Sequence, residues 1–298
     1  MHKADTDGDL AITVPTPPLE PLPTGLSPGG RLQRPLRAVL FDVYGTLIIS
    51  ASGDISLARE HLSANPDVAA LLARMDIKIP PDELCDRLAA AVQADHARQR
   101  KKGIDWPEVV IEEIWAHALE TGDLPAARRF ALAFEMAVNP VYPMPHAAEL
   151  LAEIRQTGLT AGIISNAQFY TPLLLAHFFQ ARPEEAWADP ELVFYSYQHG
   201  RAKPSCYLFD QAAAVLARRG ISPGQALYVG NDMRNDVRPA ANGGFQTALF
   251  AGDARSLRLR EEDGQEIDTR PDLVITDLAQ LMKFLPPAVQ PYTNPKPD

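Results

Sequence analysis

The sequence predicts an α/β fold: a doubly wound, mainly parallel sheet with helices on both faces and an additional helical cap. Two observations carry this prediction. Short apolar runs without strict alternation recur along the chain and are separated by helical stretches, a pattern typical of strands buried on both faces of a parallel sheet. The rhythm is broken once, by a long segment of helical character that lacks a clear strand.

The sheet and its covering helices account for most of the chain. The predicted strands are 37–41, 159–164, 192–195, 226–229, 247–250 and 273–275, and the predicted helices between them are 146–157, 171–180 and 206–218. We therefore assign 37–51 and 143–285 to the α/β core. The length of 298 residues suits such a core with a second, smaller domain.

The interruption covers residues 52–142. Its expected helices are 67–75, 81–100, 107–120 and 126–139. Proline followed by acidic residues marks the start of two of them, where the fixed φ and the helix dipole favour both residue types. An insert that follows the first strand lies over the carboxyl ends of the strands, where such sheets bind ligands. We therefore predict a cap.

The two ends of the chain are rich in proline and lack a helical or strand period. Such segments bury too little apolar surface to offset the entropy lost on ordering. We predict that 1–36 and 286–298 are disordered tails.

The composition restricts the partners. A formal net charge of −10 and an acidic pI near 5.2 disfavour binding to nucleic acid or to an anionic membrane surface. The acidic, proline-rich start argues against a secretory signal, and we expect no segment that spans a bilayer. The two cysteines suggest neither a disulfide framework nor a zinc site. We expect a cytoplasmic protein that acts on a small molecule; the oligomeric state stays open.

Polar side chains suited to catalysis come at or just after the ends of predicted strands. They are Asp42, Ser165, Asn166, Lys203, Asn231 and Asp232. Because the carboxyl ends of parallel strands meet at one edge of a sheet, these residues can form one site.

The residue types suit attack by a carboxylate. Asp42 can attack an electrophile and form a covalent intermediate. If the electrophile is a phosphate monoester, Lys203 and a divalent cation would relieve the repulsion between anions, and Mg²⁺ is the natural cation for carboxylate, carbonyl and water oxygens. Gly45 and Thr46 supply a tight turn with exposed amides and a hydroxyl, while Ser165 and Asn166 stand where a helix should begin.

Four segments in order resemble the motifs of the haloacid dehalogenase-like hydrolase superfamily, whose members have a Rossmann-like core. They are Phe-Asp-Val-Tyr-Gly-Thr-Leu at 41–47, Ile-Ile-Ser-Asn at 163–166, Lys-Pro at 203–204, and Tyr-Val-Gly-Asn-Asp at 228–232 continued to Asp236. The resemblance covers roughly residues 37–285. The helical insert lies where members with a small helical cap carry theirs.

The resemblance assigns roles to individual residues. It implies that Asp42 is the nucleophile and that Lys203 neutralises the transferring group. Tyr44, Thr46, Ser165 and Asn166 would help to hold substrate or phosphate. The implied Mg²⁺ ligands are Asp42, the backbone carbonyl of Tyr44, Asp232 and Asp236.

Two departures from the family pattern matter. Phosphatases of the family usually have aspartate two residues after the nucleophile, acting as general acid, whereas this chain has Tyr44. Tyrosine at that position is typical of the 2-haloacid dehalogenases, in which the aspartate attacks carbon without a metal. The second departure is Asn231, an amide directly after Gly230 where an acid is usual; of the two acids that follow, we favour Asp232 as metal ligand.

Other residues favour the phosphatase over the dehalogenase. Phe209 stands where those dehalogenases have tyrosine, and Arg59 is the nearest arginine that could hold a haloacid carboxylate. Two acids beside the nucleophile would repel each other without a cation. We therefore predict a Mg²⁺-dependent phosphatase acting through an aspartyl-phosphate. The alternatives are a metal-independent dehalogenase and an inactive binding protein, and the sequence leaves the substrate open.

Overall fold

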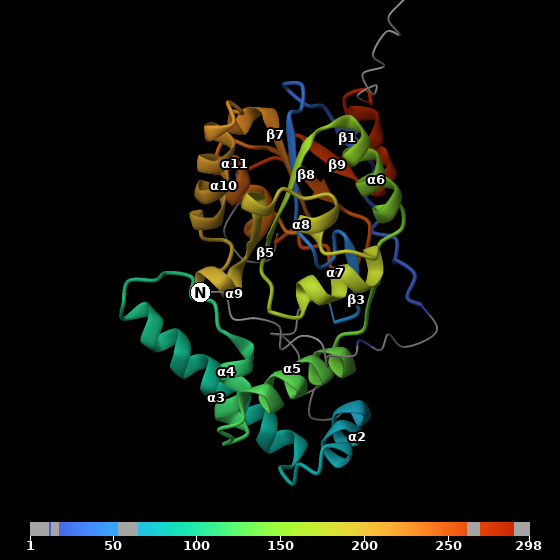
Figure 1. The fold of residues 1–298 in the computed structure, drawn as a ribbon. Helices are drawn as coiled ribbons and strands as arrows, with labels where there is room; N and C mark the ends of the chain where they lie inside the picture. The colour runs from blue at the N-terminus through green and yellow to red at the C-terminus, as the bar shows by residue number, and fades with distance from the viewer. Residues whose placement is uncertain (1–11, 13–17, 53–64, 261–268, 289–298) are drawn as a thin grey trace, which may run out of the picture.

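The computed structural model of the chain describes residues 12, 18–52, 65–260 and 269–288. Its centre is a seven-stranded sheet in the order β1-β9-β8-β7-β2-β5-β6 (Figure 1). The strands are β1 (Gly29–Gly30), β2 (Ala38–Phe41), β5 (Thr160–Ser165), β6 (Val193–Tyr195), β7 (Ala226–Gly230), β8 (Gln246–Phe250) and β9 (Leu273–Ile275). Every neighbouring pair is parallel except β1 with β9. The predicted doubly wound α/β fold is confirmed.

Helices cover both faces of this sheet (Figure 1). Along β2, Val39 and Phe41 belong to one apolar cluster and Ala38 and Leu40 to another, as the alternation of side chains along a strand requires. The first cluster includes residues of α6 (Ala147–Thr157) and the second includes residues of α10 (Tyr207–Arg218). The remaining elements around the sheet are α7 (Thr171–Phe179), α8 (Pro183–Ala186), η3 (Pro190–Leu192), α9 (Ser196–His199), η4 (Pro223–Gln225), η5 (Met233–Val237), α11 (Arg238–Asn242) and η6 (Leu278–Phe284).

The predicted insert is helical and lies apart from the sheet (Figure 1). Its helices are α2 (Pro66–Arg74), α3 (Pro81–Arg100), α4 (Ile111–Ala118) and α5 (Leu124–Val138). Trp115 of α4 packs against Phe130 and Phe134 of α5, with ring centroids 4.8 and 4.7 Å apart. The three rings belong to the same apolar cluster as Val39 and Phe41 of β2, so the insert shares a continuous apolar core with the sheet.

Two local features of the insert and its connections differ from those expected. Helix α4 begins at Ile111 rather than 107 because Pro107 forms an antiparallel bridge with Arg201 of the α/β core. The two passages between core and insert are paired strands, β3 (Ile48–Ser50) and β4 (Val141–Pro143). The sequence showed no strand there because each is only three residues long.

The expectation of a disordered N-terminal tail is wrong for residues 18–36. In this segment β1 pairs with β9, and the Gln33 and Arg34 amides donate to Gln246 Oε1 at 2.6 and 3.0 Å. Leu22 N–H donates to Asp253 Oδ1 at 3.1 Å. The segment is ordered because the core supplies its hydrogen-bond partners, which local composition does not reveal. Residues 1–11, 13–17 and 289–298 of the predicted tails lie outside the described residues.

The order of strands determines where a site can form. After β2 the chain builds β5 and β6 on one side of it, and then returns to build β7, β8 and β9 on the other. Loops therefore diverge at the carboxyl end of β2, and such switch points form the ligand crevice of open α/β sheets. No helix among the described residues is long and apolar enough to cross a membrane.

Candidate active site

Asp42 follows β2 directly and lies at the bottom of a cavity of about 420 Å³. Its backbone N–H continues the strand pairing by donating to Val229 O at 2.9 Å. The chain then turns sharply through Gly45, which has φ +78°. A Cβ there would lie 2.4 Å from Ser256 Cβ, so only glycine fits this turn. The strand and the turn together place the Asp42 carboxylate at the edge of the sheet.

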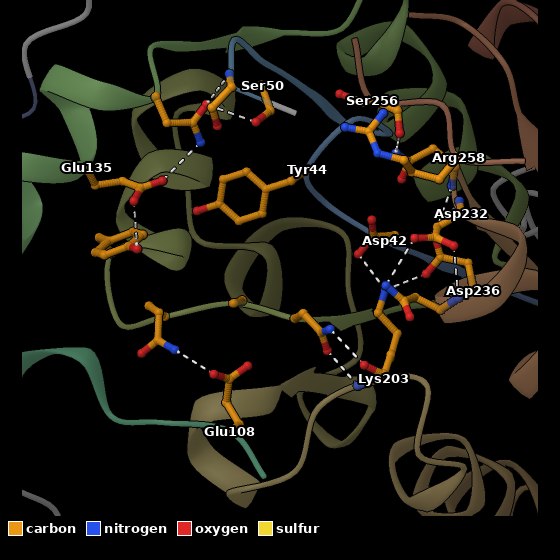
Figure 2. Close-up of a pocket in the computed structure, with 18 of the residues that line it drawn as sticks. Asp42, Tyr44, Ser50, Glu108, Glu135, Lys203, Asp232, Asp236, Ser256 and Arg258 are labelled. Carbon is orange, nitrogen blue, oxygen red and sulfur yellow. Dashed lines mark hydrogen bonds and ion pairs between the residues drawn. The ribbon is translucent and has the colours of Figure 1, made fainter. Parts of the chain in front are cut away.

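Lys203 connects the acids of the site. It is buried, and its Nζ donates to Asp42 Oδ1 at 2.7 Å and to Asp236 Oδ1 at 2.5 Å (Figure 2). The same Nζ lies 2.9 Å from Tyr228 Oη and 3.3 Å from Ile164 O. A buried ammonium is costly unless it is paired. This arrangement therefore fixes Lys203 beside Asp42.

The pKa shifts follow from this crowding. Burial acts to lower the pKa of Lys203, but the Asp236 and Asp42 carboxylates outweigh it and the pKa is raised above its ordinary value. Burial raises the pKa of Asp236 to about 7, with Lys203 opposing and Asp42 and Asp232 adding to the rise. Burial is thus the first cause of the raised pKa of Asp236, and the Lys203 ammonium opposes this rise without cancelling it.

The two acids of the last motif have different surroundings. Asp236 shares Lys203 with Asp42, and its Oδ2 accepts the Asn231 and Asp232 amides, both at 3.0 Å. Asp232 faces Arg260, whose Nη2 lies 2.5 Å from its Oδ2, and its Oδ1 caps the following turn. The sequence favoured Asp232 as the metal ligand, whereas in the structure it is Asp236 that shares Lys203 with Asp42.

The residues of the second motif support Lys203. Asn166 Oδ1 accepts the Lys203 N–H at 2.7 Å, and Asn166 Nδ2 donates to the Lys203 carbonyl at 3.1 Å. Ser165 and Thr46 are fully buried and lie outside the set of residues that line the cavity. Thr46 Oγ1 donates to Asn231 Oδ1 at 3.4 Å. Asn166 therefore positions Lys203 while lining the cavity itself, and Ser165 and Thr46 lie behind its wall.

Tyr44 lies between the aspartates of the core and Glu135 of the insert. Figure 2 shows its ring between the Asp42 side and the Glu135 side, with the hydroxyl toward Glu135. This hydroxyl lies 2.9 Å from Thr171 Oγ1. Burial, followed by the charge of Glu135, raises the pKa of Tyr44 well above its ordinary value. The phenol is thus a neutral wall of the cavity.

The sequence analysis missed two acids from the insert. Glu108, before α4, and Glu135, on α5, both line the cavity. Glu135 Oε1 accepts Asn139 Nδ2 and Oε2 accepts Tyr170 Oη, both at 3.0 Å. Burial raises the pKa of Glu135 to about 7. One signal was available: Glu135 interrupts an otherwise apolar stretch of its helix, and an acid on an apolar face is unusual.

Two arginines of the cavity were also missed. Arg258 and Arg260 come from the loop after β8, which pairs with the last motif: Arg258 N–H donates to Asn231 O at 3.0 Å, and Met233 N–H donates to Arg258 O at 2.9 Å. The sequence did not single them out, because the pairing of the two loops is not visible in either loop alone.

The donor set suits a hard cation. No group of three or more histidine, cysteine, aspartate or glutamate side chains within the described ranges could hold a metal ion. Mg²⁺, however, needs only one or two carboxylates, because water and substrate oxygens complete its shell. Asp42 and Asp236 share the single Lys203 ammonium, and a cation beside them would favour their charged forms. The site therefore fits Mg²⁺, with Asp42 and Asp236 as its nearest acids.

Comparisons with known proteins agree with this geometry. A family model described as haloacid dehalogenase-like hydrolase matches residues 36–244. Phosphoglycolate phosphatase of Escherichia coli (strain K12) is 25% identical over 273 residues, which cover 84% of this chain and 92% of that protein. Glyceraldehyde 3-phosphate phosphatase of Methanopyrus kandleri is 25% identical over 257 residues, covering 81% and 91%. The crystal structure of 2-haloacid dehalogenase from Pseudomonas syringae pv. Tomato DC3000 has the same fold, with a TM-score of 0.53, 20% identity, and coverage of 84% and 97%.

Proposed function

The chain belongs to the haloacid dehalogenase-like hydrolases, and from this premise we propose that it hydrolyses a small phosphate monoester through an aspartyl-phosphate on Asp42. One observation carries the proposal: Lys203 bridges Asp42 and Asp236 in the same cavity. An ammonium beside an attacking carboxylate offsets the repulsion of an anionic substrate. The relatives named phosphatases give further support.

The roles of the residues follow from their contacts. Lys203 holds Asp42 Oδ1, so the other oxygen, Oδ2, is the one turned to the phosphorus. Attack forms the Oδ2–P bond and breaks the bond to the alcohol oxygen. Water then cleaves the aspartyl-phosphate, so the net reaction adds one water across the ester. Asn166 keeps Lys203 in place during both steps.

We propose Mg²⁺ as the cofactor. Asp42, Asp236 and the Tyr44 carbonyl would hold it, and Asp232 is a further candidate if it leaves Arg260. When bound, the ion would neutralise the oxygens of the transferring phosphoryl group. The assignment is supported by the position of Asp42 and Asp236, two carboxylates that share one ammonium in the cavity.

The insert is proposed to act as a cap, because Glu108 and Glu135 contribute to the cavity that contains Asp42. A cytoplasmic location also belongs to the proposal. It rests on the composition and on the two cysteines, Cys85 and Cys206, which form no disulfide.

Tyr44 favours a second candidate, a 2-haloacid dehalogenase. In that reaction Asp42 would attack carbon and displace halide. Arg258 could receive the substrate carboxylate, because it lines the cavity, while Arg59 lies outside the described residues.

Turnover of phosphate esters and of 2-haloacids, with Mg²⁺ and with a chelator, separates the candidates. We expect phosphate release that needs Mg²⁺ and is lost in Asp42→Asn. The matched control is Asp82→Asn, at the start of α3 and outside the cavity, which should retain full activity. Halide release that survives chelation would replace the phosphatase by the dehalogenase.

A further inference from the structure

The cavity has two chemically different ends. Its cations, Lys203, Arg258 and Arg260, come from the α/β core, on the Asp42 side. The acids that the insert contributes lie away from Asp42 and Arg258, Glu135 beyond the Tyr44 ring and Glu108 in the lower part of the view (Figure 2). A phosphoryl group attacked by Asp42 must lie at the first end. The organic part of the ester then extends toward the second.

Glu135 is held by neutral donors. Its described partners are Asn139 and Tyr170. Asn139 cannot reverse its amide easily, because its Oδ1 already accepts Ser50 Oγ at 2.9 Å and Ser52 N–H at 3.1 Å. The carboxylate is therefore held in an acceptor-only orientation, and each of its oxygens can accept a further bond.

Glu108 is held in the same manner. Its Oε2 accepts Ser196 Oγ at 2.7 Å, and its Oε1 accepts Gln168 Nε2 at 3.1 Å and the Val109 amide at 2.9 Å. Burial raises the pKa of Glu108, and the groups that oppose this rise are neutral hydrogen-bond donors. The wall that meets the organic part thus presents two carboxylates without a described cationic partner.

Such a wall distinguishes between substrates. A second anionic group on the ester would face like charge in a partly desolvated cavity, which is unfavourable. A hydroxyl or ammonium group would instead donate to the unused lone pairs of the carboxylates.

We infer that the substrate is a phosphate monoester whose organic part carries hydroxyl or ammonium donors and no second anionic group. This inference rests on the proposed phosphatase function. The inference excludes esters that carry a carboxylate, the class to which phosphoglycolate belongs, as preferred substrates. Glu135 and Glu108 are the residues that set this preference.

Three esters with the same carbon number test the inference at pH 8, where Glu135 is largely ionised. Glycerol 3-phosphate, 3-aminopropyl phosphate and 3-phosphoglycerate end in a hydroxyl, an ammonium and a carboxylate. We expect kcat/KM for at least one of the first two to exceed that for 3-phosphoglycerate by about tenfold or more. The better of the two identifies the donor.

Variants connect the preference to the wall. The ratio measured is kcat/KM for the better of the first two esters divided by kcat/KM for 3-phosphoglycerate. Glu135→Gln, and independently Glu108→Gln, should reduce this ratio to below about threefold. Glu113 is an exposed acid on α4, and Glu113→Gln should leave the ratio unchanged. Structural damage would lower kcat/KM for all three esters together and leave their ratio intact. If one variant fails to fold, the other and the wild-type ratio still decide.

The outcomes are distinct. Equal or better turnover of 3-phosphoglycerate by the wild type, or a ratio unaffected by both variants, overturns the inference and leaves the phosphatase standing. Absence of Asp42-dependent turnover of any ester overturns the phosphatase, and the inference with it.

Discussion

Glu135 provides a quantitative test of how burial in the cavity changes a carboxyl pKa and, through it, the stability of the protein. Burial raises its pKa from 4.5 to about 7 in the folded protein. At one pKa unit per 1.36 kcal/mol, the difference corresponds to about 3 kcal/mol. Below pH 4.5 the carboxyl is protonated in both states, so it costs nothing. As pH rises toward 7 the unfolded chain loses this proton first, so the wild type loses stability, and above pH 7 the loss is constant.

The variant Glu135→Gln removes this dependence. It can keep both hydrogen bonds, because its oxygen can accept Asn139 Nδ2 while its amide donates to the Tyr170 hydroxyl, which can reverse its role. We expect the unfolding free energy of the variant, relative to wild type, to increase by about 2.5 kcal/mol between pH 5 and pH 8.

Urea unfolding followed by circular dichroism at several pH values measures this difference. Other titrating groups, Asp236 included, cancel in the comparison because both proteins contain them. Glu113→Gln, at an exposed position of the insert, should follow the wild type at every pH. The raised pKa would be refuted if the difference in unfolding free energy between Glu135→Gln and wild type stayed constant within about 0.5 kcal/mol from pH 5 to pH 8. A pKa that differs between the folded and unfolded states requires this difference to change with pH.

Two further variants test the surroundings of Asp42. Lys203→Met leaves the buried Asp42 and Asp236 without their shared cation. Urea unfolding should show that the free energy of unfolding falls by about 3–5 kcal/mol, and steady-state assays should show that kcat falls at least about 10²-fold. Near-normal activity would contradict the role of the ammonium. In Gly230→Ala the new Cβ would lie 2.4 Å from Asp236 Cγ, so we expect a lower Tm and a fall in kcat/KM of about tenfold or more, while Gly122→Ala, whose Cβ meets nothing within 4 Å, should match wild type in both measurements.

Local sequence patterns were sufficient to predict the central strands of the sheet and the residues at their carboxyl ends. The apolar run before Asp42 predicted β2, and the similar runs before Ser165 and Asn231 predicted β5 and β7. Since β2 lies between β5 and β7 and is parallel to both, the carboxyl ends of the three strands meet. The sequence could therefore place Asp42 and Asn166 at one edge of the sheet without any knowledge of long-range contacts.

Local patterns failed where a partner far along the chain decides the outcome. The proline-rich residues 18–36 are ordered by Gln246 and Asp253, more than 200 positions away in sequence. The start of α4 is displaced by the pairing of Pro107 with Arg201. None of these three partners can be recognised from the sequence of the segment that it orders.

The sequence by itself determined the parallel sheet, the helical insert and the acids at the strand ends, because each depends on a periodicity or on one residue following one strand. Only the tertiary structure decided that Lys203 joins Asp42 to Asp236, that Arg260 engages Asp232, and that Glu135 faces the cavity. The physical reason is that charge pairing depends on distances in space between loops. Spacing along the chain fixes the direction of a strand but does not fix which ammonium or guanidinium meets which carboxylate.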